Sequence, residues 1–411
     1  MKRTVCLFLI FVLVLCSSAC GIKASDLTKD IKPMPTPNYI GIDNEMEKKQ
    51  MSFSLKLFKN CAEAEKGNNL LISPVSVYMA LAMTLNGADK DTEREMSALL
   101  GADRKDINPY IKNYISSLTS NDDSKFHLAN SIWFRSDKNR LKVEESFLQT
   151  NADYFGAQVY ETEFDERAKK DINNWVKKNT DGMIDKIVDE INSDTVMYLI
   201  NALAFDAKWQ KEYEKSHVDT YTFNSYSGER NIVDMMYSSE GVYLESGKAK
   251  GFKKYYKNGD YSFLAILPNE ENDIYEFVSN GGIEEILSVE QKKGCIVAAG
   301  LPKFSYEYDI SMKAVLSKMG MPSAFDSGKA DFRKMAISSV GNIYISDVVH
   351  KTFIEVGEKG TKAGAVTKVA MNDEAAMVIE GKSVILDRPF IYMIVDNKSN
   401  LPLFIGLVAD I

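Results

Sequence analysis

The residues with the clearest potential for chemistry lie between positions 343 and 369, where a strand-like segment runs into small and β-capable residues. After Gly360 the side chains alternate between two faces of a possible strand. One face is small, and it is formed by Thr361, Ala363, Ala365 and Thr367; the other carries Lys362, Gly364, Val366 and Lys368. A slip of one residue would bury both lysines, so the register is defined. The pattern predicts a loop that can become a strand.

The usual hydrolase and nucleotide-binding motifs are missing from the chain. No serine begins S-x-x-K, no G-x-S-x-G occurs, and none of the three histidines begins H-E-x-x-H. Walker and Rossmann glycine patterns are absent as well. A triad whose members are scattered along the sequence remains open, but nothing points to one.

Residues 350–367, HKTFIEVGEKGTKAGAVT, resemble the hinge of the serpin family, which reads roughly H-K-A-F-I-E-V-N-E-E-G-T-E-A-A-A-A-T. Further serpin-like motifs follow in the family's order: NLLISPVSVYMALAMTLNG (69–87), ANSIW (129–133), INNWVKKNTDGMI (172–184), NALAFDAKW (201–209), LPKF (301–304), MGMPSAF (319–325) and DRPF (387–390). Several collinear motifs are a specific signal where one alone is weak. The resemblance covers essentially residues 47–411.

This resemblance implies a mixed α/β (α+β) serpin fold, with three β-sheets, about nine helices and an exposed reactive-centre loop. It also implies a suicide-substrate inhibitor of serine proteases, with cysteine proteases as a second class. The protein would not be an enzyme, and neither a cofactor nor a metal is implied. The alternative is a non-inhibitory serpin that acts as a binding or chaperone-like module. Small inward-facing hinge residues favour the inhibitor.

The resemblance assigns three groups of site residues. The hinge comprises Glu358, Gly360, Thr361, Ala363, Gly364, Ala365 and Thr367. A polar cluster that holds the sheet closed comprises Ser73, Ser76, Asn201 and His350, and the breach where the loop enters comprises Trp209, Lys303 and Glu358. The structural alternatives are a satisfied core histidine, a packed tryptophan and a solvated ion pair contributing at most about 1 kcal/mol.

The bond to be cut follows from the family's spacing. Counting from Glu358 reaches Glu374, so the first choice is the bond between Glu374 and Ala375, which would select a protease with a basic primary pocket. Shifts of one or two residues involve Ala376 and Met377, which suit elastase-like, subtilisin-like or chymotrypsin-like enzymes. A trypsin-like target is disfavoured, because no basic residue lies near the counted bond.

The chain's start predicts export. Residues 1–19 combine a basic tip with an apolar run too short for a comfortable membrane span. The Ser-Ala-Cys sequence ending at Cys20 resembles a bacterial lipobox, which indicates a lipoprotein signal; ordinary cleavage at the same bond is the alternative. The protein would then be extracellular or on the cell surface. Residues 20–46, with three prolines, read as a tether, and Tyr39, Ile40 and Ile42 raise the alternative of a docked tail.

Composition limits the partners. The chain has 411 residues, 45% of them hydrophobic, and a net charge of −8 that becomes about −10 once the signal is removed. This charge argues against nucleic acid and against anionic membranes as partners. We expect a monomer whose partner is the target protease. Beyond the signal and Cys20, only Cys61 and Cys295 remain, and we expect two buried thiols rather than a disulfide framework.

Overall fold

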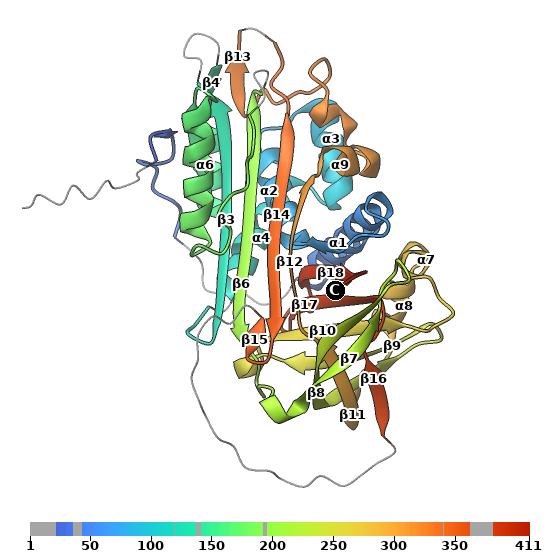
Figure 1. Ribbon diagram of the computed structural model, residues 1–411. Helices are drawn as coiled ribbons and strands as arrows, with labels where there is room; N and C mark the ends of the chain where they lie inside the picture. Colours follow the sequence, from blue (N-terminus) through green and yellow to red (C-terminus); the bar gives the residue numbers. More distant parts are fainter. Residues whose placement is uncertain are drawn as a thin grey trace, which may run out of the picture.

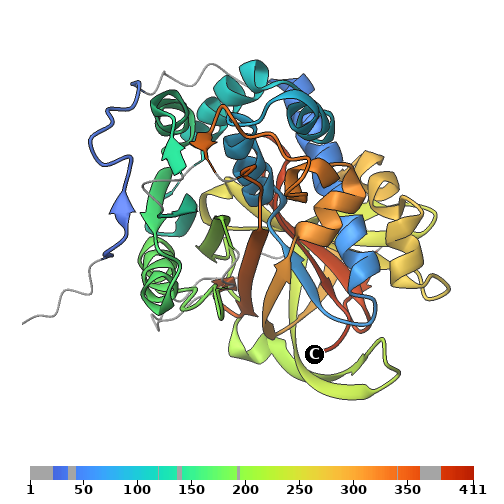
Figure 2. The same ribbon diagram turned by 90° about the horizontal axis from the view of Figure 1, so that it is seen from above.

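The computed structural model describes residues 22–35, 43–118, 120–136, 141–191, 195–339, 341–361 and 381–411, without the side chains of residues 128, 129, 201 and 202. Long strands of one sheet run the length of the molecule (Figure 1). Helix α6 covers one face of this main sheet and most other helices cover the opposite face. A second sheet packs across its lower end (Figures 1 and 2).

The described residues form nine α-helices, in agreement with the sequence prediction. They are α1 (Asn44–Ala64), α2 (Pro74–Leu85), α3 (Lys90–Leu100), α4 (Arg104–Ser117), α5 (Glu145–Phe155), α6 (Glu166–Asn179), α7 (Ile274–Ser279), α8 (Gly282–Ser288) and α9 (Lys313–Met319). Short 3-10 helices span Lys215–His217, Lys257–Gly259 and Pro322–Phe325.

Three β-sheets are present in the same part of the chain, again as predicted. The main sheet has the order β1 (Ser25–Asp26), β5 (Gln158–Thr162), β3 (Ser124–Arg135), β6 (Met197–Lys208), β15 (Gly360–Thr361), β14 (Asp347–Gly357) and β12 (Phe304–Ser311). The second sheet has the order β16 (Lys382–Ile385), β11 (Lys292–Pro302), β8 (Arg230–Glu245), β9 (Ala249–Tyr255), β10 (Tyr261–Pro268), β17 (Phe390–Asp396), β18 (Pro402–Val408) and β2 (Leu70–Ile72), with β7 (Val218–Asn224) paired to β8. The third pairs β4 (Leu141–Val143) with β13 (Ala336–Ser338).

Helix α2 is the central helix of the core. All of its residues are buried, which its almost uninterrupted apolar sequence requires. Ser73 caps its N-terminus, and Pro74 occupies the first turn, where a missing N–H is tolerated. Helix α1 is amphipathic and buries the face of Phe53, Leu57 and Cys61. The position of α2 fixes Ser73 beneath the main sheet.

A smaller core lies between α6 and the main sheet. It contains Trp133, Tyr160, Trp175 and Tyr198, and the ring centroids of Trp133 and Tyr160 are 4.3 Å apart in a stacked arrangement. Ile22 and Ala24, from the start of the described chain, pack against this cluster. Helix α6 is therefore held to the sheet by a hydrophobic layer of its own.

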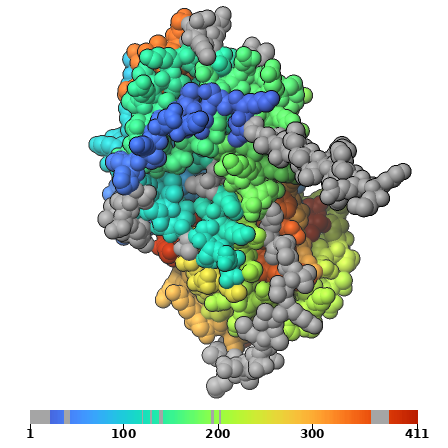
Figure 3. All heavy atoms as spheres, turned by 90° about the vertical axis from the view of Figure 1, so that its left-hand side faces the viewer, coloured from blue at the N-terminus to red at the C-terminus, as the bar shows by residue number. Residues whose placement is uncertain are grey.

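Residues 22–35 are docked on the body, which decides for this segment between the tether and the tail. Strand β1 adds to the edge of the main sheet by pairing with Tyr160 and Glu161 of β5. The main-chain N–H groups of Lys23 and Ala24 both donate to Asp171 Oδ2 of α6, at 2.9 Å each. Figure 3 shows this tail in blue, lying across the green surface that includes α6. Tyr39, Ile40 and Ile42 lie outside the described residues.

The expectation of two buried thiols is only half correct. Cys61 is fully buried, whereas Cys295 is half-buried. The reason is local: the β11–β8 ladder shifts register between Lys293 and Val297, and this irregularity leaves Cys295 less covered than a regular ladder position. Among the helices described, none is long and apolar enough to cross a membrane.

Candidate functional site

The start of the hinge is already a strand of the main sheet. After β14 the chain turns at residues 358–359 and returns as β15, which pairs antiparallel with β14 on one side and with β6 on the other. Thr361 is only 2% exposed. Its hydroxyl forms a 2.5 Å hydrogen bond with the Tyr256 hydroxyl, which is also buried. The first residue of the predicted inward face therefore occupies a buried site before any cleavage.

Gly360 is required by the close approach of two backbones. A Cβ atom at this position would collide with the carbonyl oxygen of Ala207 on β6. Any larger residue would push β15 away from β6 and break the pairing of Gly360 with Lys208. The glycine of the hinge motif thus has a structural reason that the sequence pattern alone did not supply.

Above β15, in the orientation of Figure 1, the main sheet forms a fork. Strands β6 and β14 pair directly and in parallel from the Asp347–Tyr198 pair to the Lys351–Ala202 pair. At the other end of the fork, β15 separates them at Ala207 and Lys208. Between these points residues 203–206 of β6 pair with β3, and no pairing with β14 is found for them in the part of the chain that the structure describes. Because β6 and β14 are parallel, a strand that continues β15 could pair antiparallel with both of them there.

His350 lies at the closed end of the fork. It is fully buried and stands in register with Asn201 of β6. The main-chain N–H of Ser73 donates to His350 Nε2 at 3.0 Å, and Ser73 Oγ in turn accepts from the Ser76 N–H at 3.4 Å. The structure thus brings Ser73, Ser76 and His350 together as expected; the side chain of Asn201 is not described.

Burial controls the charge of His350. Desolvation lowers the pKa of this histidine to about 3, so the ring is neutral at physiological pH. Because Nε2 accepts a hydrogen bond, the proton of the neutral ring is on Nδ1. No described side chain accepts from Nδ1. The closed sheet therefore contains His350 in its neutral form, with Nε2 as the hydrogen-bond acceptor.

Trp209 and Tyr213 bind the turn that leads into β15. The indole N–H of Trp209 donates to the carbonyl of Gly357 at 2.8 Å. The main-chain N–H groups of Trp209 and Tyr213 donate to the carbonyls of Lys359 and Glu358, also at 2.8 Å each. Three consecutive carbonyl groups of the turn thus have partners from these two residues. The Trp209 ring also stacks on Tyr256, with centroids 4.5 Å apart.

The predicted ion pair at the base of the loop is formed. Lys303 Nζ lies 2.5 Å from Glu358 Oε1 and 3.2 Å from Asp234 Oδ2. Burial, the largest single effect, raises the pKa of the Glu358 carboxyl, but the hydrogen bond and charge of Lys303 together with a main-chain hydrogen bond outweigh it, and the pKa is lowered. Both side chains remain about one-third exposed, so the pair contributes at most about 1 kcal/mol.

Several predicted site residues lie outside the described residues. They are Cys20 and the loop residues Ala363, Gly364, Ala365, Thr367, Glu374, Ala375, Ala376 and Met377. Within the described ranges, no group of three or more histidine, cysteine, aspartate or glutamate side chains could hold a metal ion.

The sequence did not reveal Tyr213, Asp234 and Tyr256 as members of the site. Each lies far along the chain from the residue that it contacts, and none belongs to a motif that signals such a contact. Only the tertiary fold places the two tyrosines against the hinge.

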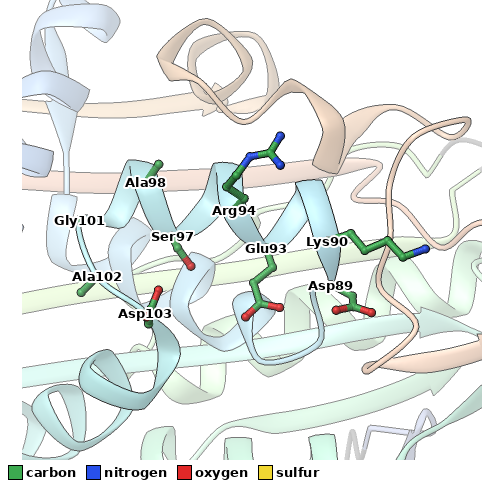
Figure 4. Close-up of a pocket in the computed structure, with 9 residues that line it drawn as sticks. All are labelled: Asp89, Lys90, Glu93, Arg94, Ser97, Ala98, Gly101, Ala102 and Asp103. Carbon is green, nitrogen blue, oxygen red and sulfur yellow. The ribbon is translucent and has the colours of Figure 1, made fainter.

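A surface hollow beside α3 belongs to a different region (Figure 4). It is lined by Asp89, Lys90, Glu93, Arg94, Ser97, Ala98, Gly101, Ala102 and Asp103. Its charged groups are engaged: Asp89 and Glu93 both pair with Lys334, and Arg94 pairs with Asp91. Since α3 and β15 lie at opposite ends of the molecule in Figure 1, this hollow takes no part in the hinge.

Comparison with known proteins identifies the family. The model of the family described as Serpin (serine protease inhibitor) matches residues 48–411. Human serpin B10 is 30% identical over 395 residues, covering 87% of this chain and 97% of that protein. A serpin-like protein of Thermococcus kodakarensis is 31% identical over 391 residues, covering 92% of this chain and 89% of that protein.

Solved structures agree with the sequence comparison. The thermophilic serpin tengpin in its native state is 44% identical, with a TM-score of 0.88, and the match covers 94% of this chain and all of that one. Tengpin in its latent state, also 44% identical, gives a TM-score of 0.76 and covers 90% of this chain and 98% of that one. The chain therefore belongs to the serpin family, whose members are typically protease inhibitors rather than catalysts.

Proposed function

We propose that this serpin is a suicide-substrate inhibitor of serine proteases that traps the acyl-enzyme by inserting its cleaved loop into the main sheet. The observation that carries the proposal is β15, which occupies a place between β6 and β14 with Thr361 buried. The next inward-facing residues in the sequence, Ala363, Ala365 and Thr367, are small enough to follow Thr361 into the fork.

In the proposed reaction, hydrolysis of the acyl-enzyme competes with insertion of the loop. The protease serine attacks the carbonyl of the residue before the cut bond, the amide bond breaks, and the new amino terminus leaves while the ester remains. If water then attacks the ester, the protease is released and the inhibitor is lost as a substrate. If the loop inserts first, it carries the bound protease along the sheet and distorts its active site before hydrolysis.

Insertion is driven by strand pairing and burial. Serpin loop insertion is itself a standard instance of strand addition and of stored strain. Each new ladder hydrogen bond contributes roughly 1 kcal/mol net, and burial of the small inward side chains adds to it. A ladder that extends over many residues is enough to make the change irreversible. The greater likeness to native than to latent tengpin supports a starting state in which this energy is still stored.

We place the cut bond between Glu374 and Ala375, with the bonds on either side of Ala376 as the alternatives. A glutamate before the bond selects a protease with a basic primary pocket, such as a glutamyl endopeptidase, because a buried carboxylate needs a charge partner. The alternatives select an elastase-like or subtilisin-like enzyme.

We further propose that the protein is an exported monomer anchored by a lipid at Cys20, on the strength of the N-terminal sequence. It needs no cofactor for the proposed reaction, since the protease supplies the nucleophile and the sheet supplies the driving force. Labelling with a fatty-acid analogue, compared between the full chain and Cys20→Ala, tests the anchor.

A protease panel tests the inhibitory function. The protein is incubated with glutamyl-, elastase-, subtilisin- and chymotrypsin-type enzymes, and the products are boiled in detergent and separated by size. We expect a covalent complex with at least one enzyme, together with a small C-terminal fragment of the inhibitor. Cleavage of the loop by every enzyme without a stable complex would contradict inhibition and favour the non-inhibitory binding module.

A further inference from the structure

A buried ion pair lies beneath the residues that hold the hinge turn. Lys254, on β9, places its Nζ 2.9 Å from Glu240 Oε1 on β8, and the two side chains are only 3% and 11% exposed. The same ammonium lies 4.2 Å from the centroid of the Tyr213 ring and 5.5 Å from that of Trp209. A charge from the second sheet thus supports the two residues that bind the turn.

The contacts continue from the ion pair to the hinge without a gap. Ser238 donates to Glu240 Oε1 at 2.7 Å and lies 3.5 Å from the Tyr213 hydroxyl. Tyr213 and Trp209 donate to the turn, and Tyr256, stacked on Trp209, is bonded to Thr361. A shift of the Trp209 ring would break its indole bond to Gly357 and disturb the stacked Tyr256, and a shift of Tyr213 that moved its main chain would weaken the bond to Glu358. The turn and β15 would then loosen together.

The buried pair is suited to fixing the positions of its neighbours rather than to raising global stability. An ion pair this deeply buried is expensive to desolvate, and an apolar pair of similar size is often equally or more stable. A desolvated ammonium over aromatic faces, in contrast, fixes where those rings lie. The feature to expect from this pair is a defined ring position rather than a higher global stability.

We propose that Lys254 and Glu240 are positioning residues for the trapping reaction, because they hold Trp209 and Tyr213 where these residues keep β15 inserted before a protease arrives. The inference rests on the inhibitory function proposed above. With β15 in place, the cleaved loop extends an existing strand and does not have to form its first pairing during the lifetime of the acyl-enzyme. Loss of the pair therefore increases the fraction of acyl-enzyme that is hydrolysed before the loop inserts.

The test replaces the pair by neutral residues of similar shape, in the double variant Lys254→Met with Glu240→Gln. The control removes an exposed ion pair of similar length, Lys318 with Glu63 (2.7 Å), by Lys318→Met with Glu63→Gln between α9 and α1. The variant Lys254→Arg keeps the cation and should restore function to the extent that the guanidinium fits. Each protein is assayed for inhibitor consumed per protease trapped, for hydrogen exchange of a peptide covering residues 357–361, and for thermal unfolding.

For the double variant we expect roughly 2- to 30-fold more inhibitor consumed per protease trapped, the range implied by the loss of a desolvated cation–π contact. We also expect faster exchange of residues 357–361, with an unfolding midpoint no lower than that of the control. Wild-type consumption by the double variant would overturn the inference, whether or not exchange changes, and so would an equal rise in the control. If the wild type itself traps no protease, the proposed function fails, and exchange alone then decides whether the pair holds the hinge.

Discussion

Replacement of Thr361 by arginine tests the hinge most directly, because the residue is both the start of the loop and a buried member of the sheet. The hydroxyl of Thr361 is bonded to Tyr256, and its strand is paired on one side with β6 and on the other with β14. An arginine at this position brings a charge into a site that is 2% exposed, with no carboxylate bonded there to receive it.

The cost of burying this arginine exceeds the stabilisation that β15 gains from its hydrogen bonds. Burying an unpaired charge costs several kcal/mol, and leaving the Tyr256 hydroxyl without a partner costs about 1–3 kcal/mol more. A two-residue strand offers only a few ladder hydrogen bonds in return, at roughly 1 kcal/mol each. We therefore expect β15 to leave the sheet in Thr361→Arg, and we expect insertion after cleavage to stop at its first step.

The assay compares stable complex with released, cleaved inhibitor at several inhibitor-to-protease ratios. Thr361→Arg should be cleaved as a substrate, with little or no complex. Thr361→Val is the matched control: it keeps the shape and loses only the hydroxyl, so it should still trap protease while unfolding at about 1–3 kcal/mol lower stability. Trapping by Thr361→Arg at the wild-type ratio would refute insertion as the mechanism.

Three further predictions concern other parts of the molecule. His350→Ala should lower stability by roughly 1–3 kcal/mol and promote polymers or a latent form on warming. Because burial lowers the pKa of His350 from its ordinary 6.5 to about 3, the wild type should also lose stability as the pH falls from 6.5 to 3. His350→Gln should lose less stability over this range, which urea unfolding at pH 7 and pH 4 will show. Asp171→Ala, which removes the acceptor for two tail N–H groups, should lower stability by about 1–3 kcal/mol, and deletion of residues 22–35 should lower it further or speed inactivation. If urea unfolding and the half-life of activity were unchanged in both variants, the tail would have no structural role. Mass spectrometry of the fragment released from a trapped complex should give Ala375 as its first residue, and a new terminus outside residues 372–378 would overturn the assignment of the bond.

The sequence predicted the family, the three sheets, the nine helices and the pairing of Lys303 with Glu358. These features follow from motifs whose order and spacing along the chain are specific. It did not predict that Thr361 would already be buried, because alternation of small residues indicates that a strand can form but not whether it has formed. That outcome depends on Gly360 and on Tyr256, which lies more than a hundred positions earlier in the chain.

For the tail, too, the sequence pattern did not show which contacts would form. Its prolines suggested a spacer, and its most apolar residues, Tyr39, Ile40 and Ile42, suggested docking. The described docking involves residues 22–35, and much of it uses main-chain groups that any sequence possesses: the N–H groups of Lys23 and Ala24 and the pairing of β1, besides the packing of Ile22 and Ala24. Main-chain recognition leaves little trace in side-chain composition, and its acceptor, Asp171, is a single carboxylate among several charged residues of α6.

The docked tail also determines how a lipid attached at Cys20 would transmit force from the membrane to the folded body. Only Gly21 separates Cys20 from Ile22, where the chain meets the body, and the two Cα–Cα steps span at most about 7 Å. The protein would then have no slack between membrane and fold, and the side bearing α6 would be held close to the bilayer. A force on the anchor would act first on β1, at the edge of the sheet into which the loop inserts in the proposed mechanism. Lateral tension at the cell surface and the readiness of the inhibitor would thus be mechanically linked.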